Sequence, residues 1–146
     1  CMGDNAFFGG AAWARWLPPS MASVGEDELF SRCWELLVLD AQGAARLAEA
    51  GRLPLCRTVL LPQETAGGAL RARQVVDCGL SRRCSLTLSS LWAPPVLCVQ
   101  RRLAAAGGAV IEPQDIPLPL RWQRLPPEAL LLTAGAWLLG EGHIPT

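Results

Sequence analysis

The sequence predicts an α/β fold in which a small parallel sheet is extended by antiparallel strands and closed by a C-terminal helix. Between residues 34 and 79, short apolar runs alternate with helical segments, an order that favours parallel strands joined by right-handed crossovers. Beyond residue 85 the apolar side chains alternate with polar ones, as they do in half-buried strands. An apolar stretch over 126–140, with proline at its start and glycine at its end, indicates the closing helix.

Length and composition favour one compact unit. The chain has 146 residues, of which 51% are hydrophobic and 18% are charged, a composition far from that of disordered proteins. We therefore expect a single α/β domain over residues 1–146. Its expected parts are a parallel part (1–80), an antiparallel extension (81–120) and the closing helix (126–140).

The N-terminal segment predicts a loop and two short helices. The stretch GDNAFFG (3–9) has the composition of a glycine-bounded loop and leads into a helical segment. Trp13, Trp16 and Leu17 fall on one face of that helix, and the two prolines that follow end it. The acidic residues at 26–28 suit the first turn of a second short helix.

Residues 34–79 alternate as strand, helix, strand, helix, strand. The strands are WELLVLD (34–40), CRTVLLP (56–62) and VVDCG (75–79), and their continuous apolar runs are typical of strands buried on both faces. The helices are the Ala-rich segment 41–53, which Gly51 ends, and QETAGGALRARQ (63–74), which carries two glycines in its middle. This βαβαβ order predicts the parallel sheet.

The antiparallel extension begins with the alternating segment SLTLSSL (85–91). The segments VLCVQRRL (96–103) and AVIEPQDIPL (109–118) flank AAAGG and predict a hairpin with a short glycine turn. Pro113 and Pro117 place the last strand at an edge of the sheet, because proline lacks the N–H that a central strand donates.

Charge and residue content exclude several classes of function. Thirteen basic and thirteen acidic residues cancel, and no stretch is long and apolar enough to span a membrane, so we expect neither nucleic acid nor a membrane as a partner. Every basic residue is Arg and Tyr is absent, which excludes a Schiff-base lysine, a phosphate-loop lysine and a phenolic proton donor. The one histidine, His143, lies in the C-terminal GEGHIPT and is a poor candidate for a catalytic base. A non-enzymatic function is favoured.

Four cysteines, Cys33, Cys56, Cys78 and Cys98, lie in or beside apolar runs, where a thiol packs as a small buried hydrophobe. We expect these thiols to be reduced and the protein to be cytoplasmic. The sequence has no Cys-x-x-Cys pair, so no metal site is expected.

The stretch VVDCGLSRRCSLTLSS (75–90) invites comparison with the loop of a cysteine phosphatase. That loop needs an arginine six residues after the cysteine, at the start of a helix, so that thiolate and guanidinium face one phosphate. Here Cys84 holds that position, Arg83 comes one place early, and the next residues alternate as in a strand. We interpret the stretch as a turn after a strand, with backbone freedom at Gly79 and Arg82 in solvent.

In GDNAFFG, Gly3, Ala6 and Gly9 have the three-residue spacing of a glycine-rich dinucleotide loop. The stretch resembles the Gly-x-x-Gly-Phe-x-Gly fingerprint of extended short-chain dehydrogenases and epimerases. That resemblance implies a Rossmann-like core that binds NAD or another nucleotide. Asp40, at the end of the next strand, would accept a hydrogen bond from a ribose hydroxyl. Ala6 replaces the middle glycine, and the family's catalytic Tyr and Lys are absent, so the dehydrogenase chemistry is not implied.

Two further resemblances concern other parts of the chain. The segments LVLDAQG and VVDCGLSRRCSLTLSSL resemble the end of the central domain of Mur ligases. The whole chain resembles small uncharacterised Firmicute proteins with a Gly-Leu-Ser turn, a Thr-Leu-Ser-Ser strand, and a Gln-Arg and Glu-Pro-Gln hairpin. Since the chain has no Gly-Lys-Thr/Ser phosphate loop, ligase activity is not implied.

A ligand site is expected where the parallel strands end, because ligands of such sheets bind outside the carboxyl ends of the strands. The residues expected at this edge are Gly3, Asn5, Gly9, Asp40, Gln42, Glu64, Gly79, Ser81 and Arg82.

Two main functions stay open at this point. The first is a non-catalytic or vestigial module that binds a nucleotide-type ligand, which predicts an open polar pocket at this edge. The second is a structural or protein-interaction scaffold, with a homo-oligomer or another protein as partner. The scaffold predicts that the glycine loop is packed shut and that an apolar surface lies elsewhere, for example over 112–127. A metal-dependent hydrolase built on Asp40, Glu64 and Asp77 is a further alternative.

Overall fold

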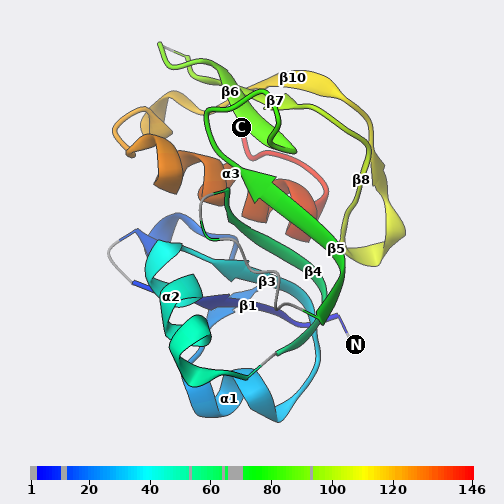
Figure 1. Cartoon of the computed structure of the whole chain (residues 1–146). Helices are drawn as coiled ribbons and strands as arrows, with labels where there is room; N and C mark the ends of the chain where they lie inside the picture. Colours follow the sequence, from blue (N-terminus) through cyan, green and yellow to red (C-terminus); the bar gives the residue numbers. More distant parts are fainter. Residues whose placement is uncertain (1–2, 11–12, 53, 64, 66–70, 93) are drawn as a thin grey trace.

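The computed structural model of the protein describes residues 3–10, 13–52, 54–63, 65, 71–92 and 94–146. In this part of the chain the main sheet has eight strands in the order β10-β7-β6-β5-β4-β3-β1-β2, with β8 and β9 forming a separate pair. The sheet is mostly parallel, and α3 near the C-terminus packs on it, which confirms the predicted fold class (Figure 1). None of the described helices is long and apolar enough to cross a membrane.

The strands and helices have the following bounds. The first five strands are β1 (Asn5–Phe8), β2 (Met21–Ser23), β3 (Trp34–Leu39), β4 (Leu55–Pro62) and β5 (Arg71–Cys78). They are followed by β6 (Leu86–Ser90), which pairs parallel with β5 and antiparallel with β7. The later strands are β7 (Val96–Val99), β8 (Leu103–Ala104), β9 (Val110–Ile111) and β10 (Gln114–Pro117). The α-helices are α1 (Glu26–Ser31), α2 (Ala41–Ala50) and α3 (Pro127–Glu141), and the 3-10 helices are η1 (Ala14–Trp16), η2 (Ala106–Gly108) and η3 (Leu120–Trp122).

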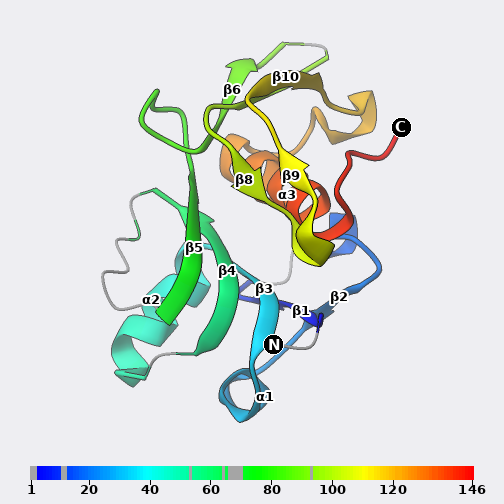
Figure 2. The ribbon, with the colours of Figure 1, turned by 90° about the vertical axis from the view of Figure 1, so that its right-hand side faces the viewer.

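Helices cover the sheet on both faces. Helix α3 lies on one face, and α1 and α2 lie on the other, as the two perpendicular views show (Figures 1 and 2). Neighbouring residues of one strand therefore enter different clusters of the core: Phe7 packs on the α3 side and Phe8 on the α2 side. Burial on both faces explains why β3 and β4 are apolar almost without interruption.

Helix α3 packs closely on the centre of the sheet. A Cβ atom at Gly135 would lie 2.7 Å from Cδ2 of Leu60 and 3.0 Å from Cδ1 of Leu86, so the missing side chain lets the helix approach these leucines. The helix begins at Pro127 and is followed by Gly142 in the left-handed conformation (φ 82°), close to the predicted bounds 126–140.

The sheet divides between β5 and β6, which pair only at Cys78 and Leu86 within the described residues. Side chains hold the diverging strands together. Asp77 Oδ1 accepts hydrogen bonds from the backbone N–H of Ser85 (2.9 Å) and from its hydroxyl (2.8 Å), and Arg101 Nε donates to Ser85 Oγ (2.6 Å). The turn that the sequence predicts after Cys78 thus ends in a structural network rather than in a catalytic loop.

The helix predicted over 63–74 is wrong at its C-terminal end, because residues from Arg71 onward belong to β5. The strand alternates: Gln74, Val76 and Cys78 face the α3 side, and Gln74 Nε2 and Oε1 bond the backbone C=O and N–H of Ala104 (both 2.9 Å). Pairing with β4 therefore outweighs the helical propensity of the segment. Residues 64 and 66–70 lie outside the described part of the chain.

The loop predicted over GDNAFFG is also wrong, because Asn5–Phe8 form the buried strand β1 between β2 and β3. The glycines of the turn that follows this strand are Gly9 and Gly10. The later expectations hold: β8 and β9 form a hairpin around Gly107 and Gly108, both with positive φ, and β10 lies at the edge of the sheet.

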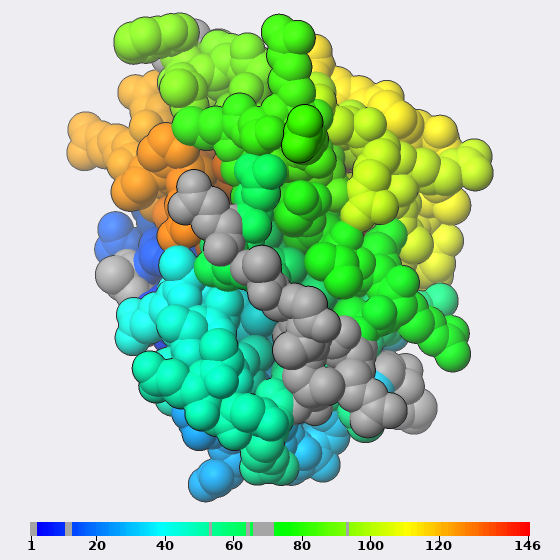
Figure 3. Space-filling view, in the orientation of Figure 1, coloured from blue at the N-terminus to red at the C-terminus, as the bar shows by residue number. Residues whose placement is uncertain are grey.

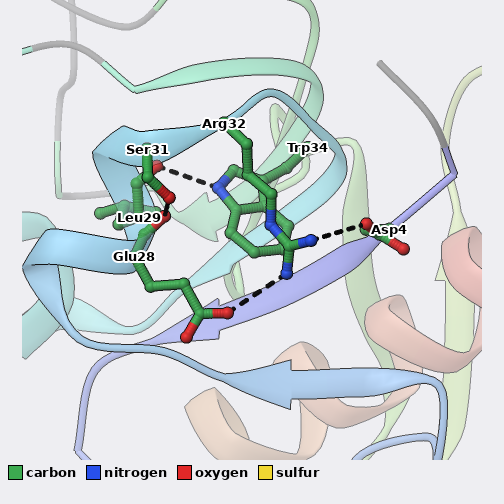
Figure 4. Close-up of polar contacts among 6 residues, drawn as sticks. All are labelled: Asp4, Glu28, Leu29, Ser31, Arg32 and Trp34. Carbon is green, nitrogen blue, oxygen red and sulfur yellow. Dashed lines mark hydrogen bonds and ion pairs between the residues drawn. The ribbon is translucent and has the colours of Figure 1, made fainter.

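A polar cluster closes the amino ends of β1 and β3 (Figure 4). Arg32 bridges Asp4 (3.0 Å) and Glu28 (3.2 Å), and its guanidinium lies 4.3 Å from the centre of the Trp34 ring. Trp34 Nε1 in turn donates to the carbonyl of Leu29 in α1 (3.0 Å). These groups fix α1 against the sheet at the edge opposite the expected ligand site.

Candidate functional site

The crevice between the carboxyl ends of β1 and β3 is where the sheet topology predicts a ligand site. The chain leaves β1 towards β2 on one side and returns as β3 on the other, and open α/β sheets bind ligands where the strand order reverses in this way. Gly9 and Gly10 follow β1, and Asp40 and Gln42 follow β3.

The Asp40 carboxylate accepts hydrogen bonds from the backbone of this chain. The residue is 6% exposed, and its Oδ1 accepts a hydrogen bond from the N–H of Gly43 (2.7 Å), which caps the start of α2. Its Oδ2 accepts a second one from the N–H of Gly10 (2.8 Å). Asp40 thus ties the turn after β1 to α2, with one backbone donor on each of its carboxylate oxygens.

The glycines of this crevice have no room for a side chain. A Cβ at Gly9 would overlap the carboxylate of Asp40, and a Cβ at Gly10 would lie 2.7 Å from Oε1 of Gln42. On the other side of the crevice, a Cβ at Gly43 would overlap the carbonyl oxygen of Phe8. Around these three glycines, the described atoms of the protein therefore fill the crevice.

A pocket of about 520 Å³ opens farther along the same edge, at the carboxyl ends of β4 and β5. Its described lining residues are Ala41, Pro62, Gln63, Thr65, Cys78, Gly79, Leu80, Pro127, Glu128 and Leu131. The pocket thus lies between two strand ends and the first residues of α2 and α3. We call it the strand-end pocket.

The polar side chains of the strand-end pocket are mostly neutral, and two of them are positioned by hydrogen bonds within the protein. Thr65 Oγ1 donates to the carbonyl of Pro62 (2.6 Å), and Gln63 Oε1 accepts from the thiol of Cys84 (3.0 Å). Burial raises the pKa of the Cys78 thiol, so this wall carries a neutral S–H at pH 7. Glu128 is the only acidic lining residue in the described part of the chain, and no basic residue lines the pocket there.

The structure separates the residues that the sequence predicts together. Gly79 lines the strand-end pocket, whereas Gly9, Asp40 and Gln42 lie at the filled crevice. Gly3 and Asn5 lie at the amino end of β1, where the Asn5 amide nitrogen is beside Gly140 of α3.

Ser81 and Arg82 follow β5 in the described structure. Ser81 is part of the turn after β5, with its Oγ accepting from the N–H of Arg83 (3.1 Å), and Arg82 is exposed. Neither residue is among the described lining residues of the strand-end pocket. Glu64 lies outside the described residues.

The sequence did not predict three polar residues of the strand-end pocket, Gln63, Thr65 and Glu128. The signal for the first two is their place directly after the apolar run CRTVLLP, which the prediction of a helix over 63–74 hides. The signal for Glu128 is the proline that precedes it, because Pro-Glu marks the start of a helix.

The hydrolase alternative gains no support from the described residues. Asp40 bonds Gly10 and Gly43, Asp77 bonds Ser85, and these two carboxylates serve separate structural contacts. Within the described ranges, no three His, Cys, Asp or Glu side chains are grouped as a metal site requires.

The cysteines differ in redox state. Cys33 is disulfide-bonded, so the prediction of a reduced thiol is wrong for this residue. Cys56, Cys78, Cys84 and Cys98 are free, and the first three are buried. Burial raises the pKa of Cys56 from 9.0 to about 12.

This shift predicts a loss of stability in alkali. Above pH 9 the unfolded chain loses the Cys56 proton and the folded protein keeps it, so the free energy of unfolding falls as pH rises towards 12. Between pH 8 and 10.5 the contribution of this thiol should fall by about 2 kcal/mol. Urea unfolding of wild type and Cys56→Ala at both pH values measures it. The variant should lose about that much less than the wild type, and an equal loss in both proteins would refute the assignment.

Comparison of the chain with protein-family models, with curated proteins and with solved structures gives no match. The resemblances to the dehydrogenase fingerprint, to Mur ligases and to the Firmicute proteins therefore stay predictions.

Proposed function

We propose that the protein is a non-catalytic, Rossmann-like module that binds a nucleotide-type small molecule in the strand-end pocket. The observation that carries the proposal is the pocket itself, about 520 Å³ at the carboxyl ends of β4 and β5. Its volume falls within the range of small-molecule sites. It lies at the carboxyl edge of the parallel strands, which is the edge where open α/β sheets bind ligands, and it is displaced by two strands from the point where the strand order reverses.

The topology of the sheet supports a Rossmann-like origin. The order β2-β1-β3-β4-β5 is the strand order of flavodoxin-like doubly wound sheets. The filled crevice between β1 and β3 moves the expected site along the edge to β4 and β5. There Gln63, Thr65 and Glu128 offer donors and acceptors that suit the hydroxyl and amide groups of a nucleoside, with NAD among the candidates.

The chemistry of the pocket favours binding over catalysis. The Cys78 thiol has a raised pKa, which opposes formation of the reactive thiolate. His143, the only histidine of the chain, follows the C-terminal end of α3, and its Nδ1 contacts the carbonyl of Glu141 (3.1 Å). It lies at the opposite end of α3 from Glu128, so no histidine base is available to the pocket.

We also propose that this is a bacterial cytoplasmic protein, as its resemblance to Firmicute proteins implies. The three buried free thiols suit a reducing compartment, whereas the disulfide at Cys33 is typical of an oxidising one. Fractionation of the producing cells tests the assignment, and recovery outside the cytoplasm would overturn it.

A thermal-shift screen against nucleotides, dinucleotides and nucleotide sugars tests the binding function. A ligand at one hundred times its dissociation constant should stabilise the protein by about 2.7 kcal/mol, which is roughly 5 to 10 °C for a domain of this size. The exposed Ala41 lines the pocket at the first turn of α2, so Ala41→Phe should fill the pocket and abolish the shift. Ala48→Phe, on an exposed position of the same helix away from the pocket, should keep it.

The scaffold remains the second candidate, because the described groups around Gly9, Gly10 and Gly43 pack closely against one another, as a scaffold would require. Large apolar side chains are also exposed elsewhere, with Trp92 83% and Leu120 59% accessible. Absence of a shift with every compound, or an equal shift in wild type and Ala41→Phe, would favour this function over the binding module.

A further inference from the structure

A second cleft lies between η1 and η3, on the α3 side of the sheet. Its volume is about 680 Å³, and its described lining residues are Arg15, Trp16, Leu120, Arg121, Gln123, Arg124 and Leu125. In the space-filling view the atoms of η3 and the start of α3 (orange) lie beside those of the segment after β1 (blue) (Figure 3). We call it the arginine cleft.

The arginine cleft has a strongly positive wall. Three arginines line it, and no Asp or Glu stands among its described lining residues. Arg32, Arg46, Arg57 and Arg102 form ion pairs with acidic side chains elsewhere, whereas within the described part of the chain Arg15, Arg121 and Arg124 form none. Arg121 Nη1 donates a hydrogen bond to the backbone oxygen of Thr146 (3.0 Å), an acceptor that a phosphate oxygen would replace. The chain has no net charge, so this grouping is local and does not follow from a basic composition.

Two of the guanidinium groups rest on aromatic rings that the core holds in place. The Arg15 guanidinium carbon lies 5.2 Å from the centre of the Trp16 ring, and that of Arg121 lies 5.9 Å from the Trp122 ring. Trp122 is 1% exposed, and the carbonyl of Trp16 accepts a hydrogen bond from Trp137 Nε1 of α3 (2.9 Å). These contacts restrict the exposed side chains of Arg15 and Arg121 before a ligand arrives, which lowers the entropic cost of binding.

We propose that the arginine cleft binds the phosphate groups of a small phosphorylated molecule. A guanidinium presents a planar fork of N–H donors that matches two phosphate oxygens, and three such groups can surround a diphosphate. Trp16, Leu120 and Leu125 form an apolar wall that can contact the organic part of the ligand. The site shares no described lining residue with the strand-end pocket, so this proposal does not rest on the proposed function.

Titration calorimetry with inorganic pyrophosphate at low ionic strength tests the site. The double variant Arg121→Ala/Arg124→Ala should weaken binding at least tenfold. The control Arg73→Ala/Arg83→Ala removes the same charge from exposed positions outside the cleft and should change the affinity less than twofold. Replacing Arg121 and Arg124 with Lys keeps the charge but loses the fork, and should weaken binding several-fold.

The same experiment can overturn the proposal. Equal weakening in the two alanine doubles would mean that general electrostatics attracts the anion, and absence of pyrophosphate binding to the wild type would refute a phosphate site. Binding of hexaglutamate but not of pyrophosphate would assign the cleft to an acidic protein partner instead. If the Arg121/Arg124 variant fails to fold, Arg15→Ala tests the opposite wall. Ala41→Phe should leave pyrophosphate binding unchanged, which separates this site from the strand-end pocket.

Discussion

Replacing Gly43 with alanine should destabilise the protein by about 3 kcal/mol, at the upper end of the cost of overpacking. Alanine normally stabilises a helix by about 1 kcal/mol relative to glycine, so the predicted sign is the reverse of the intrinsic one. The reason is that the added Cβ would overlap the carbonyl oxygen of Phe8 and lie 2.8 Å from its carbonyl carbon. Because the contact is with backbone, it cannot be relieved by a side-chain rotation, and α2 must move off β1.

Urea unfolding measures this effect, with a fall in melting temperature of roughly 10 °C as the second readout. Gly25→Ala is the matched control, since a Cβ there meets nothing within 4 Å and the backbone φ is −90°. The control should change the free energy of unfolding by less than about 1 kcal/mol. A stable Gly43→Ala variant would mean that α2 does not pack on β1 as described.

Asp40→Ala should cost a similar amount, about 3 kcal/mol, through two lost contacts. The first is the cap on Gly43 N–H, worth about 1 kcal/mol, and the second is the charged hydrogen bond to the N–H of Gly10, worth about 2 kcal/mol. Denaturant unfolding of the variant measures the sum.

Asp40→Asn separates the two contacts. Asparagine caps helices as well as aspartate does but offers one carbonyl oxygen in place of two, so the expected loss is smaller, about 2 kcal/mol. If Asp40→Ala kept full stability but lost the ligand-induced thermal shift, the structural role would be contradicted. Asp40 would then be assigned to the ligand site.

The fold was predictable where local pattern and tertiary environment agree. The apolar run over 34–40 becomes β3, the Ala-rich segment becomes α2 with Gly51 at its end, and Pro127 and Gly142 bound α3. The prediction failed where they disagree. The segment 71–74 has a composition typical of helices. It forms a strand because it pairs in parallel with β4 and because the Gln74 side chain makes hydrogen bonds with the backbone of Ala104.

The candidate site was predictable only as an edge of the sheet. Parallel strands end together, so the sequence could place Gly79 at the edge where the strand-end pocket lies. The sequence could not show that the Asp40 carboxylate accepts hydrogen bonds from two backbone N–H groups. That arrangement depends on how closely Gly9 approaches Asp40 and Gly43 approaches Phe8. The arginine cleft leaves no local signal, because Arg15 and Arg121 come from distant parts of the chain.

The central claim is that a small molecule binds at the carboxyl ends of β4 and β5. Amide chemical-shift mapping with the compound that gives the largest thermal shift tests it most directly. We predict that the largest perturbations fall on Gln63, Gly79 and Glu128, which line the strand-end pocket. Perturbations centred on Gly10 and Gln42, at the filled crevice between β1 and β3, would contradict the claim.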